Sequence, residues 1–307
     1  MIRAFVLGAG LGTRLRPLTL QFPKPLIPVH QRPLLEYAFQ HLHAAGVREF
    51  VVNTHHLPDE YLRAFPNAAW RGCPITFRHE PVLLETGGGL ANVQDLLRND
   101  GPFFVYNGDV FTDLPLAPAL ELHRASGNMV TLVLRSSGPV RNVAVLHPHN
   151  RVIDLRNARQ TNHPDQFQFT GICIVEPAFF KYLPAVGVIE SLVAAWLRAI
   201  EAGERIGSAV IDEGLWLDLG DRASYLDAHR LIRPENGQRV HPSAMIAAGV
   251  EIDDASSVGA GCSIEPGAII RGSILWPGAR VTAGARLDRC VVMAGHTASG
   301  ILKNADV

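Results

Sequence analysis

The chain has 307 residues, of which 47% are hydrophobic and 19% charged, and its formal net charge is −1. This composition is typical of a soluble globular protein with one large or two modest domains, and the near-zero charge excludes a general basic field for nucleic acid or membrane. The four cysteines are scattered without a C-x-x-C pair, and no stretch approaches the ~20 apolar residues of a membrane span. We therefore expect a cytoplasmic protein with reduced thiols and no membrane or nucleic-acid partner.

The chain opens with a short apolar run, residues 2–7, that predicts a buried first strand of a parallel sheet. A loop with glycines at positions 8, 10 and 12 follows, and this spacing lets successive backbone N–H groups converge on a phosphate. Arg14 and Lys24 come next, and Lys24 stands between two prolines in a chain with only three lysines. The glycines alone are also consistent with a tight turn, but the added charges favour a polyphosphate pocket.

Two widespread phosphate-binding motifs do not fit this loop. Thr13 stands where a G-x-G-x-x-G motif needs its third glycine, and no G-x-x-x-x-G-K-[ST] string occurs. The pattern G-x-G-T-R-L-x-P-L-T followed by P-K-P resembles the signature of the sugar-1-phosphate nucleotidyltransferases. The resemblance covers residues 1–232 and implies catalytic roles for Arg14 and Lys24, with Lys24 also at the sugar phosphate. It further implies nucleotide binding by Leu7, Gly8, Ala9, Gly10, Gly12, Thr13 and Arg14.

Apolar residues recur at helical spacing from Leu35 to Leu42, and a strand is expected over residues 49–53, as at the start of a parallel α/β sheet. A strand over residues 75–79 then leads to Glu80 and to three glycines, 87–89, which precede another helical pattern. We expect their bare backbone at a helix N-terminus, with a flexible turn as the alternative.

The segment with these glycines corresponds to the L-G-T-x-G segment that contacts the nucleotide base in the family. The resemblance therefore implies that Glu80, Thr86, Gly87 and Gly88 bind the nucleotide. Glu85 stands where many members have glycine, and we assign it to the sugar phosphate. The form L-E-T-G-G-G is most similar to the N-acetylmuramate 1-phosphate uridylyltransferases, and less similar to the mannose-1-phosphate guanylyltransferases.

A buried strand over residues 103–106 ends in Asn107, Gly108 and Asp109. An acidic residue just past the carboxyl end of a parallel strand lies where α/β sheets bind ligands, and Mg²⁺ prefers one or two carboxylates plus phosphate oxygens. A turn aspartate is the alternative. The family's G-D motif favours Asp109 as a catalytic metal ligand, with Asn107 and Gly108 at the nucleotide.

Strands with irregular connections are expected over residues 129–175, without the Val-Glu-Lys-Pro string that binds the sugar phosphate in many relatives. Arg156 and Arg159 are candidate substitutes, and each is equally well an ordinary surface charge. Gly171 matches the family's aromatic-x-Gly strand start, near the sugar. A W-x-D-x-G string resembles one of the family, and this resemblance implies that Asp218 is the second metal ligand and a sugar-phosphate contact. The nearby Asp212 and Glu213 are interpreted as turn residues.

From residue 240 the apolar period changes to six, which is typical of hexapeptide repeats in a parallel β-helix. The repeating positions are Val240, Ile246, Ile252, Val258, Ile264 and Ile270, and after a one-residue slip Leu275, Val281, Leu287 and Met293. We expect a Rossmann-like, mostly parallel α/β nucleotidyltransferase domain over residues 1–232 and a polar linker over 233–239. A short left-handed β-helix over 240–307 is expected to assemble a homo-oligomer.

The predicted reaction is Mg²⁺-dependent in-line attack of a sugar 1-phosphate on the α-phosphorus of UTP, or of GTP or dTTP. Uridylyl transfer to N-acetylmuramate 1-phosphate or a hexose 1-phosphate is the first interpretation, and mannose-1-phosphate guanylyltransferase activity is the alternative. Hexapeptide repeats also occur in acyltransferases, but the repeat here is short for an acyl-CoA site. The intact set of Arg14, Lys24, Asp109 and Asp218 disfavours a non-catalytic nucleotide sensor. The sequence identifies neither the sugar nor the base.

Overall fold

The computed structural model describes residues 2–98, 101–234 and 237–307. The chain divides into two compact units, one made of the residues up to Leu11 with Leu35–Trp216, and the other of Gly12–Leu34 with Leu217–Val307. We call these the first and the second unit. Residues 235 and 236 of the expected linker 233–239 lie outside the described residues, and the domain limits 1–232 and 240–307 stay a prediction. No helix within the described ranges is long and apolar enough to cross a membrane.

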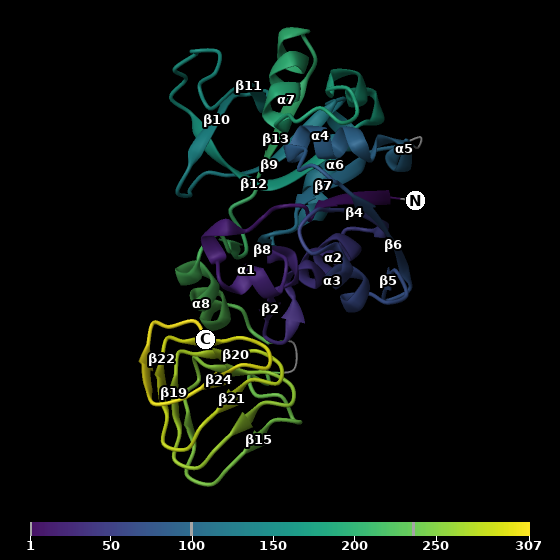
Figure 1. Cartoon of the computed structure of the whole chain (residues 1–307). Helices are drawn as coiled ribbons and strands as arrows, with labels where there is room; N and C mark the ends of the chain where they lie inside the picture. Colours follow the sequence, from purple (N-terminus) through teal and green to yellow (C-terminus); the bar gives the residue numbers. More distant parts are fainter. Residues whose placement is uncertain (1, 99–100, 235–236) are drawn as a thin grey trace. The chain divides into compact units, whose positions relative to one another are not determined.

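The first unit is built around strand β1 (Ile2–Leu7), which pairs in parallel with β4 (Val47–Thr54) on one side and β7 (Phe103–Asn107) on the other (Figure 1). Strand β6 (Cys73–His79) continues the parallel order beyond β4. The consecutive residues Ala4, Phe5 and Val6 of β1 are all fully buried. Both faces of this strand are therefore covered, which is why its apolar run shows no alternation. The expected parallel start of the sheet is confirmed.

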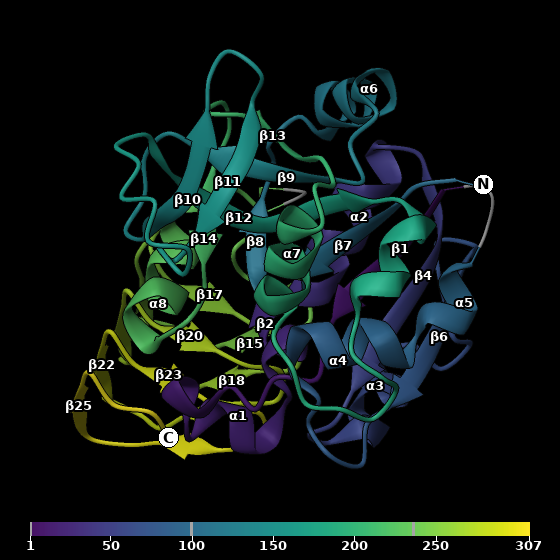
Figure 2. The same ribbon diagram turned by 90° about the horizontal axis from the view of Figure 1, so that it is seen from above.

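The rest of the sheet mixes parallel and antiparallel strands. The prediction of a mostly parallel sheet therefore holds only for the strands around β1. Strand β12 (Gln166–Val175) runs antiparallel to β7 and β9 (Val130–Arg135), and β13 (Ile206–Val210) runs parallel to β9. Antiparallel strands can follow one another through short connections. This is the case for β10 (Arg141–Leu146) and β11 (Arg151–Leu155), which Figure 2 shows as neighbours.

Strand β10 also pairs with β12, and β11 pairs with β13, so that β9, β12, β10, β11 and β13 close a ring. Leu132, Val143 and Val152 of these strands are buried members of the apolar core of the unit. The other elements between residues 34 and 218 are α2 (Leu34–Ala44), α3 (Pro58–Ala64), β5 (Ala69–Trp70), α4 (Glu85–Asn92), α5 (Gln94–Leu97), β8 (Val110–Thr112), α6 (Leu116–Ser126), the 3-10 helix η3 (Pro177–Tyr182), α7 (Leu192–Glu201) and β14 (Trp216–Asp218).

The second unit begins with short elements. These are η1 (Thr13–Leu15), α1 (Leu18–Gln21), η2 (Lys24–Leu26), β2 (Pro28–Val29) and β3 (Arg32–Pro33). Helix α8 (Arg222–Leu231) follows, and Asp221 and Ser224 close a capping box at its start. The repeat strands are β15 (Met245–Ile246), β16 (Glu251–Ile252), β17 (Ser257–Val258), β18 (Ser263–Ile264), β19 (Ile269–Arg271), β20 (Ile274–Leu275), β21 (Arg280–Val281), β22 (Arg286–Asp288), β23 (Val291–Val292), β24 (Thr297–Ala298) and β25 (Ile301–Lys303).

The repeat strands form parallel sheets in the orders β15-β18-β21-β24, β16-β19-β22-β25 and β17-β20-β23. Within a sheet, equivalent apolar positions pair, as Ile264 does with Val281. One expected position is wrong, because Val292 and not Met293 pairs with Leu275. From Leu275 to the paired Val292 the chain is one residue shorter than three six-residue periods require. Val292 therefore joins the buried apolar cluster in place of Met293.

Candidate functional site

In the first unit, two of the expected nucleotide-binding segments meet at the carboxyl ends of β1 and β7. The backbone N–H of Gly108 donates to the carbonyl of Leu7 at 3.0 Å. Gly8 is fixed from both sides, because its N–H donates to Asn53 Oδ1 at 2.8 Å and its carbonyl accepts from the Tyr61 hydroxyl at 2.7 Å. Beyond these contacts, Ala9 is buried while Gly10 is exposed.

Asn53 belongs to this region, although the sequence analysis assigned it no role. Its Nδ2 donates to Glu80 Oε1 at 2.7 Å, and Glu80 Oε2 accepts from the N–H of Leu84 at 3.2 Å. Glu80 is fully buried, so its carboxylate depends on these donors to replace water. Glu80 thus links the ends of β4 and β6 to the start of α4 and holds Asn53 against Gly8. The sequence signal that could have identified Asn53 as a site residue is its position as a polar residue at the end of an apolar parallel strand.

The three glycines lie inside α4 (Glu85–Asn92), which corrects the expectation that they precede the helix. Glu85 is exposed with a left-handed φ of 59° and begins the helix. The N–H groups of Gly87 and Gly88 both donate to the carbonyl of Glu190, at 2.8 and 3.0 Å. A Cβ added to Gly88 would lie only 2.2 Å from the carbonyl oxygen of Val188. Glycine is therefore needed at this position for the approach of another backbone segment.

The hydroxyl of Thr86 is engaged by the same segment, since its Oγ1 accepts from the N–H of Leu192 at 2.8 Å. Residues 188–192 thus occupy donors and acceptors of the first turn of α4. Contact of the base with Thr86, Gly87 and Gly88 stays a prediction, and in this structure their polar groups bind protein.

Asp109 lies half-buried in the turn between β7 and β8. Next to it, a Cβ added to Gly171, whose φ is +85°, would lie 2.9 Å from Asn107 Nδ2. Asn107, Gly108, Asp109 and Gly171 therefore gather at the carboxyl end of β7. Asp212, the acidic residue that lies near Asp218 in the sequence, is engaged elsewhere. Its carboxylate accepts hydrogen bonds from the N–H and the hydroxyl of Ser136.

In the second unit, three of the expected charged residues come together. Lys24 lies in η2 with only 6% of its surface exposed, and its Nζ is 3.6 Å from Asp218 Oδ1. A Cβ added to Gly220 would lie 2.7 Å from Arg14 Nη2 and 3.2 Å from Asp218 Oδ1. The guanidinium of Arg14 therefore lies against the backbone that follows Asp218. Thr13 and Gly12 precede it, and Thr13 is exposed.

The positive charge of Arg14 also acts on Asp221. Hydrogen bonds from Ser224, above all from its backbone N–H, lower the pKa of Asp221, and the positive charge of Arg14 adds to this lowering. The stretch 218–221 is therefore negative and faces a cationic partner.

The segment that carries Arg14 and Lys24 is built on α8 and the repeat strands. The side-chain amide of Gln21 makes two bonds to the backbone of Ala294, with Nε2 donating to the carbonyl at 2.9 Å and Oε1 accepting from the N–H at 3.0 Å. The ring centroids of Phe22 and Trp276 are 5.4 Å apart. Trp276 Nε1 donates to the hydroxyl of Tyr225 at 2.9 Å.

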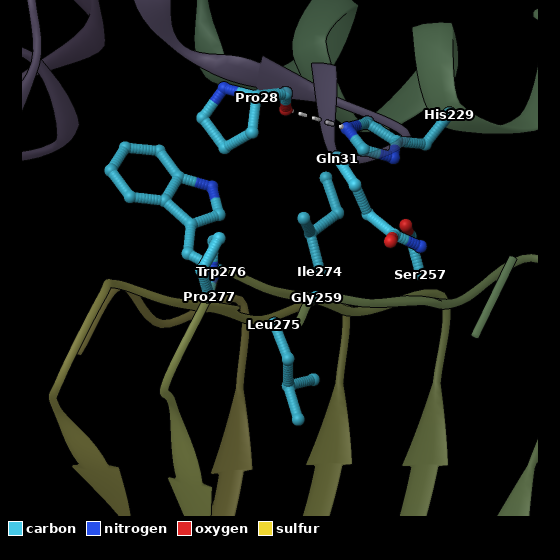
Figure 3. Close-up of a pocket in the computed structure, with 9 residues that line it drawn as sticks. All are labelled: Pro28, Gln31, His229, Ser257, Gly259, Ile274, Leu275, Trp276 and Pro277. Carbon is cyan, nitrogen blue, oxygen red and sulfur yellow. Dashed lines mark hydrogen bonds between the residues drawn. The ribbon is translucent and has the colours of Figure 1, made fainter. Parts of the chain in front are cut away.

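Figure 3 shows a neighbouring part of the second unit, where the β2–β3 hairpin, α8 and the repeat strands line a small cavity. Ile274 and Trp276 point from the repeat strands toward the β2–β3 hairpin, whereas Leu275 points the other way, into the repeats. Pro28 of the hairpin accepts from Tyr225 at 2.6 Å and lies 3.3 Å from His229 Nε2. Successive side chains of this strand thus alternate between two cores, one inside the repeats and one under the hairpin.

The two expected metal ligands, Asp109 and Asp218, are both carboxylates. Among the described residues, no group of three or more His, Cys, Asp and Glu side chains is arranged to hold a metal ion. Asp109 and Asp218 supply one carboxylate in each unit. Hard carboxylate oxygens in this small number fit Mg²⁺, which takes its other ligands from phosphates and water.

Three comparisons place the chain among known proteins. Residues 3–235 match the family model described as nucleotidyl transferase. The chain is 30% identical over 301 residues to the mannose-1-phosphate guanylyltransferase of Mycobacterium tuberculosis, covering 94% of this chain and 83% of the relative. It is 25% identical to the UTP–glucose-1-phosphate uridylyltransferase of Synechocystis sp., over 93% of this chain and 86% of that protein.

Among solved structures, HddC from Yersinia pseudotuberculosis complexed with GMP-PN is similar, with a TM-score of 0.61. The match covers 75% of this chain and 99% of HddC at 19% sequence identity. At this identity the likeness supports the mixed α/β fold alone.

Proposed function

The chain belongs to the nucleotidyl transferase family and is a sugar-1-phosphate nucleotidyltransferase, and from this premise we propose that it transfers a uridylyl group from UTP to a sugar 1-phosphate. The string around Glu85 and a uridylyltransferase among the relatives support uridine. Guanylyl transfer to mannose 1-phosphate is the second candidate, because guanylyltransferases stand among the most similar relatives. The observation that carries the activity is the cluster of Arg14, Lys24 and Asp218 within the family signature.

The proposed mechanism needs no protein base. An oxygen of the sugar phosphate is already anionic, so it attacks the α-phosphorus in line, the new P–O bond forms, and the bond to pyrophosphate breaks. Catalysis then comes from positioning and from neutralising charge. We assign Arg14 to the pyrophosphate leaving group and the buried Lys24 to the sugar phosphate.

Asp109 and Asp218 are proposed to hold Mg²⁺, which when bound neutralises phosphate charge. The nucleotide is proposed to lie along Leu7, Gly8, Ala9, Gly10, Gly12 and Thr13, with Glu80, Thr86, Gly87, Gly88, Asn107 and Gly108. For the sugar phosphate we propose Glu85 and Gly171 beside Lys24 and Asp218. The network of Asn53 and Glu80 positions Gly8 for this role.

The test crosses four nucleoside triphosphates with a panel of sugar 1-phosphates and measures pyrophosphate release with and without Mg²⁺. We expect turnover with UTP, lost in Lys24→Ala. Lys181→Ala is the matched control, because Lys181 is an exposed lysine that pairs with Glu204. Turnover with GTP alone would replace the first candidate by the second. Release of pyrophosphate with no pair of substrates would reject the proposed function.

We further propose that the repeats form a left-handed parallel β-helix that assembles a homo-oligomer in the cytoplasm. The three parallel sheets with shared buried positions support the helix. The large exposed side chains Met245 and Ile301 lie on its strands and are candidates for subunit contact. Light scattering of Met245→Glu and Ile301→Glu tests this, and an unchanged mass in both would argue against assembly through these strands.

A further inference from the structure

Helix α2 contacts both strands that flank the turn with Asp109. Tyr37 and His41 are one helical turn apart and therefore lie on the same face of α2. The ring of Tyr37 meets that of Phe111 in β8 edge to face, with ring centroids 5.2 Å apart. The ring of His41 meets that of Tyr106 in β7 in the same way, at 5.9 Å. One face of α2 thus packs against the chain before and after Asp109.

The imidazole of His41 also joins two positions in this part of the chain by hydrogen bonds. Its Nε2 lies 2.6 Å from the backbone carbonyl oxygen of Leu114, and its Nδ1 lies 3.2 Å from the hydroxyl of Tyr106. Tyr106 precedes Asp109 in the chain and Leu114 follows it. We call residues 106–114 the β7–β8 segment. His41 therefore ties the first residue of the β7–β8 segment to the last.

Hydrogen-bond chemistry determines which nitrogen of His41 carries the proton. A carbonyl oxygen can only accept, so Nε2 donates to Leu114. In the neutral ring Nδ1 is then an acceptor, and the hydroxyl of Tyr106 donates to it. Burial lowers the pKa of His41 and outweighs the opposing effects of the bond to Leu114 and of the negative charge of Asp113. The ring is therefore neutral near pH 7, the form in which both bonds are made.

Both partners of His41 depend on these bonds because water does not reach them. Tyr106 and Leu114 have no exposed surface. Burial also raises the pKa of Tyr106, so its hydroxyl keeps the proton that it donates. A buried hydroxyl or carbonyl that loses its partner has no water to replace it, and this is costly. Without the imidazole, the β7–β8 segment must shift until these two groups find other partners.

Other hydrogen bonds hold the β7–β8 segment from different elements. The N–H of Gly108 donates to the carbonyl of Leu7 in β1. The hydroxyl of Thr112 donates to the carbonyl of Leu215 at 2.8 Å, and Asp113 Oδ1 accepts from the N–H of Leu215 at 2.5 Å. These bonds hold the middle of the segment, and His41 adds one bond at each end. A side chain inside the segment is thereby restricted in where it can lie.

We infer that His41 is a positioning residue for Asp109, whose two hydrogen bonds keep this carboxylate in place for Mg²⁺. The inference rests on the proposed function, in which Asp109 is a metal ligand. Mg²⁺ demands near-ideal octahedral geometry, so a small shift of a carboxylate weakens its binding. Partners that orient a metal ligand are worth about tenfold to a hundredfold in metal affinity or activity. His41 acts through the backbone of the β7–β8 segment, so we expect an effect at the lower end of this range.

The test compares H41L, which removes both hydrogen bonds, with Y106F, which removes one hydroxyl. H43L is the matched control, because His43 lies on the same helix and its ring contacts Trp70 instead. The initial rate is measured against Mg²⁺ concentration at saturating UTP and sugar 1-phosphate. We expect the Mg²⁺ concentration for half-maximal rate to rise about tenfold in H41L, less in Y106F, and to stay unchanged in H43L. H41L/Y106F should need no more Mg²⁺ than H41L, because Tyr106 acts through His41.

Three further measurements need no turnover. Binding of Mn²⁺, which accepts the same octahedral oxygen ligands, is followed by electron paramagnetic resonance with UTP present and no acceptor. We expect weaker Mn²⁺ binding in H41L than in H43L. Hydrogen exchange over residues 106–114 should be faster in H41L and unchanged in H43L. Nitrogen NMR of the wild type should show the ring proton of His41 on Nε2.

Each outcome decides for or against the inference. A merely structural role of His41 would lower the melting temperature of H41L and leave its Mg²⁺ requirement and Mn²⁺ binding as in H43L, and this result would overturn the inference. If H41L does not fold, Y106F decides, because a Mg²⁺ requirement and Mn²⁺ binding equal to those of the wild type would overturn it as well. Weaker Mn²⁺ binding in H41L, without turnover of any substrate pair by the wild type, would reject the proposed reaction and keep His41 as the residue that positions Asp109.

Discussion

The two units hold different kinds of expected site residues. The first unit offers mainly backbone groups at strand ends, and these are fixed by buried side chains such as Asn53 and Glu80. The second unit offers charged side chains, Arg14 and Lys24, on a short segment that depends on α8 and the repeats. A sheet fixes the ends of its strands through its own hydrogen bonds, whereas a segment of short turns needs outside support. The repeats thus support the segment that carries Arg14 and Lys24.

The largest expected effect is at the proposed metal ligand of the first unit. Asp109→Asn keeps the size of the side chain and removes its charge, so we expect kcat to fall about a thousandfold, or about 4 kcal/mol of transition-state stabilisation. Asp95→Asn on exposed helix α5 is the control, since Asp95 only pairs with Arg78 on the surface. Near-normal rates of Asp109→Asn at saturating Mg²⁺ would remove Asp109 from the site.

A smaller loss is expected from Lys24→Arg in the second unit. The guanidinium is broader than the ammonium and does not fit a nearly buried point-charge site between two prolines. We expect kcat/KM to fall about a hundredfold, nearly as far as in Lys24→Ala, with little change in Lys181→Arg. If arginine restores activity, Lys24 provides only a general positive field.

Gln21→Ala tests whether contact with the repeats matters for the proposed catalytic roles of Arg14 and Lys24. It removes two hydrogen bonds to Ala294, each of about 1 kcal/mol, so we expect kcat to fall about five- to tenfold in a folded protein. Hydrogen exchange over residues 18–26 should rise with it. The matched variant Gln94→Ala loses a bond to Ala91 in the first unit and should leave both quantities unchanged. Faster exchange with full activity would show that the activity does not depend on how well this segment is ordered.

The smallest effect is a loss of stability in acid that belongs to the second unit. Burial lowers the pKa of His30 to about 4 and lowers that of His229 well below its usual value, and the two rings lie 4.7 Å apart. The unfolded chain therefore binds more protons below pH ~6.5, so the stability is present above that pH and is lost as the pH falls from ~6.5 toward ~4.

Between pH 7.5 and 5 we expect His30 to cost about 2 kcal/mol of this stability. Thermal unfolding between pH 7.5 and 5 measures it, and His30→Gln should flatten the dependence. His149→Gln changes an exposed histidine and should leave the slope as in the wild type. An equal slope in all three proteins would mean that His30 and His229 do not control acid stability.

Local sequence patterns and contacts between distant segments determine different parts of this protein. The apolar run of β1, the helical spacing of α2 and the buried positions of the repeats are local patterns, and the sequence was sufficient to predict them. The expectation for the glycines of α4 failed at the boundary, because the helix starts before them. Met293 was misplaced because the six-residue period shortens inside the repeats.

The sequence by itself determined the charged signature, the strand-loop-helix-strand start of the sheet and the period of the repeats, because each follows from neighbouring residues. Only the tertiary structure decided that Glu190 binds Gly87 and Gly88, that Gln21 binds Ala294, and that His41 joins Tyr106 to Leu114. These groups are brought together by chain segments that pack from distant positions. A hydrogen bond between such segments leaves no periodic trace in the sequence, since its energy depends on where the fold places both partners.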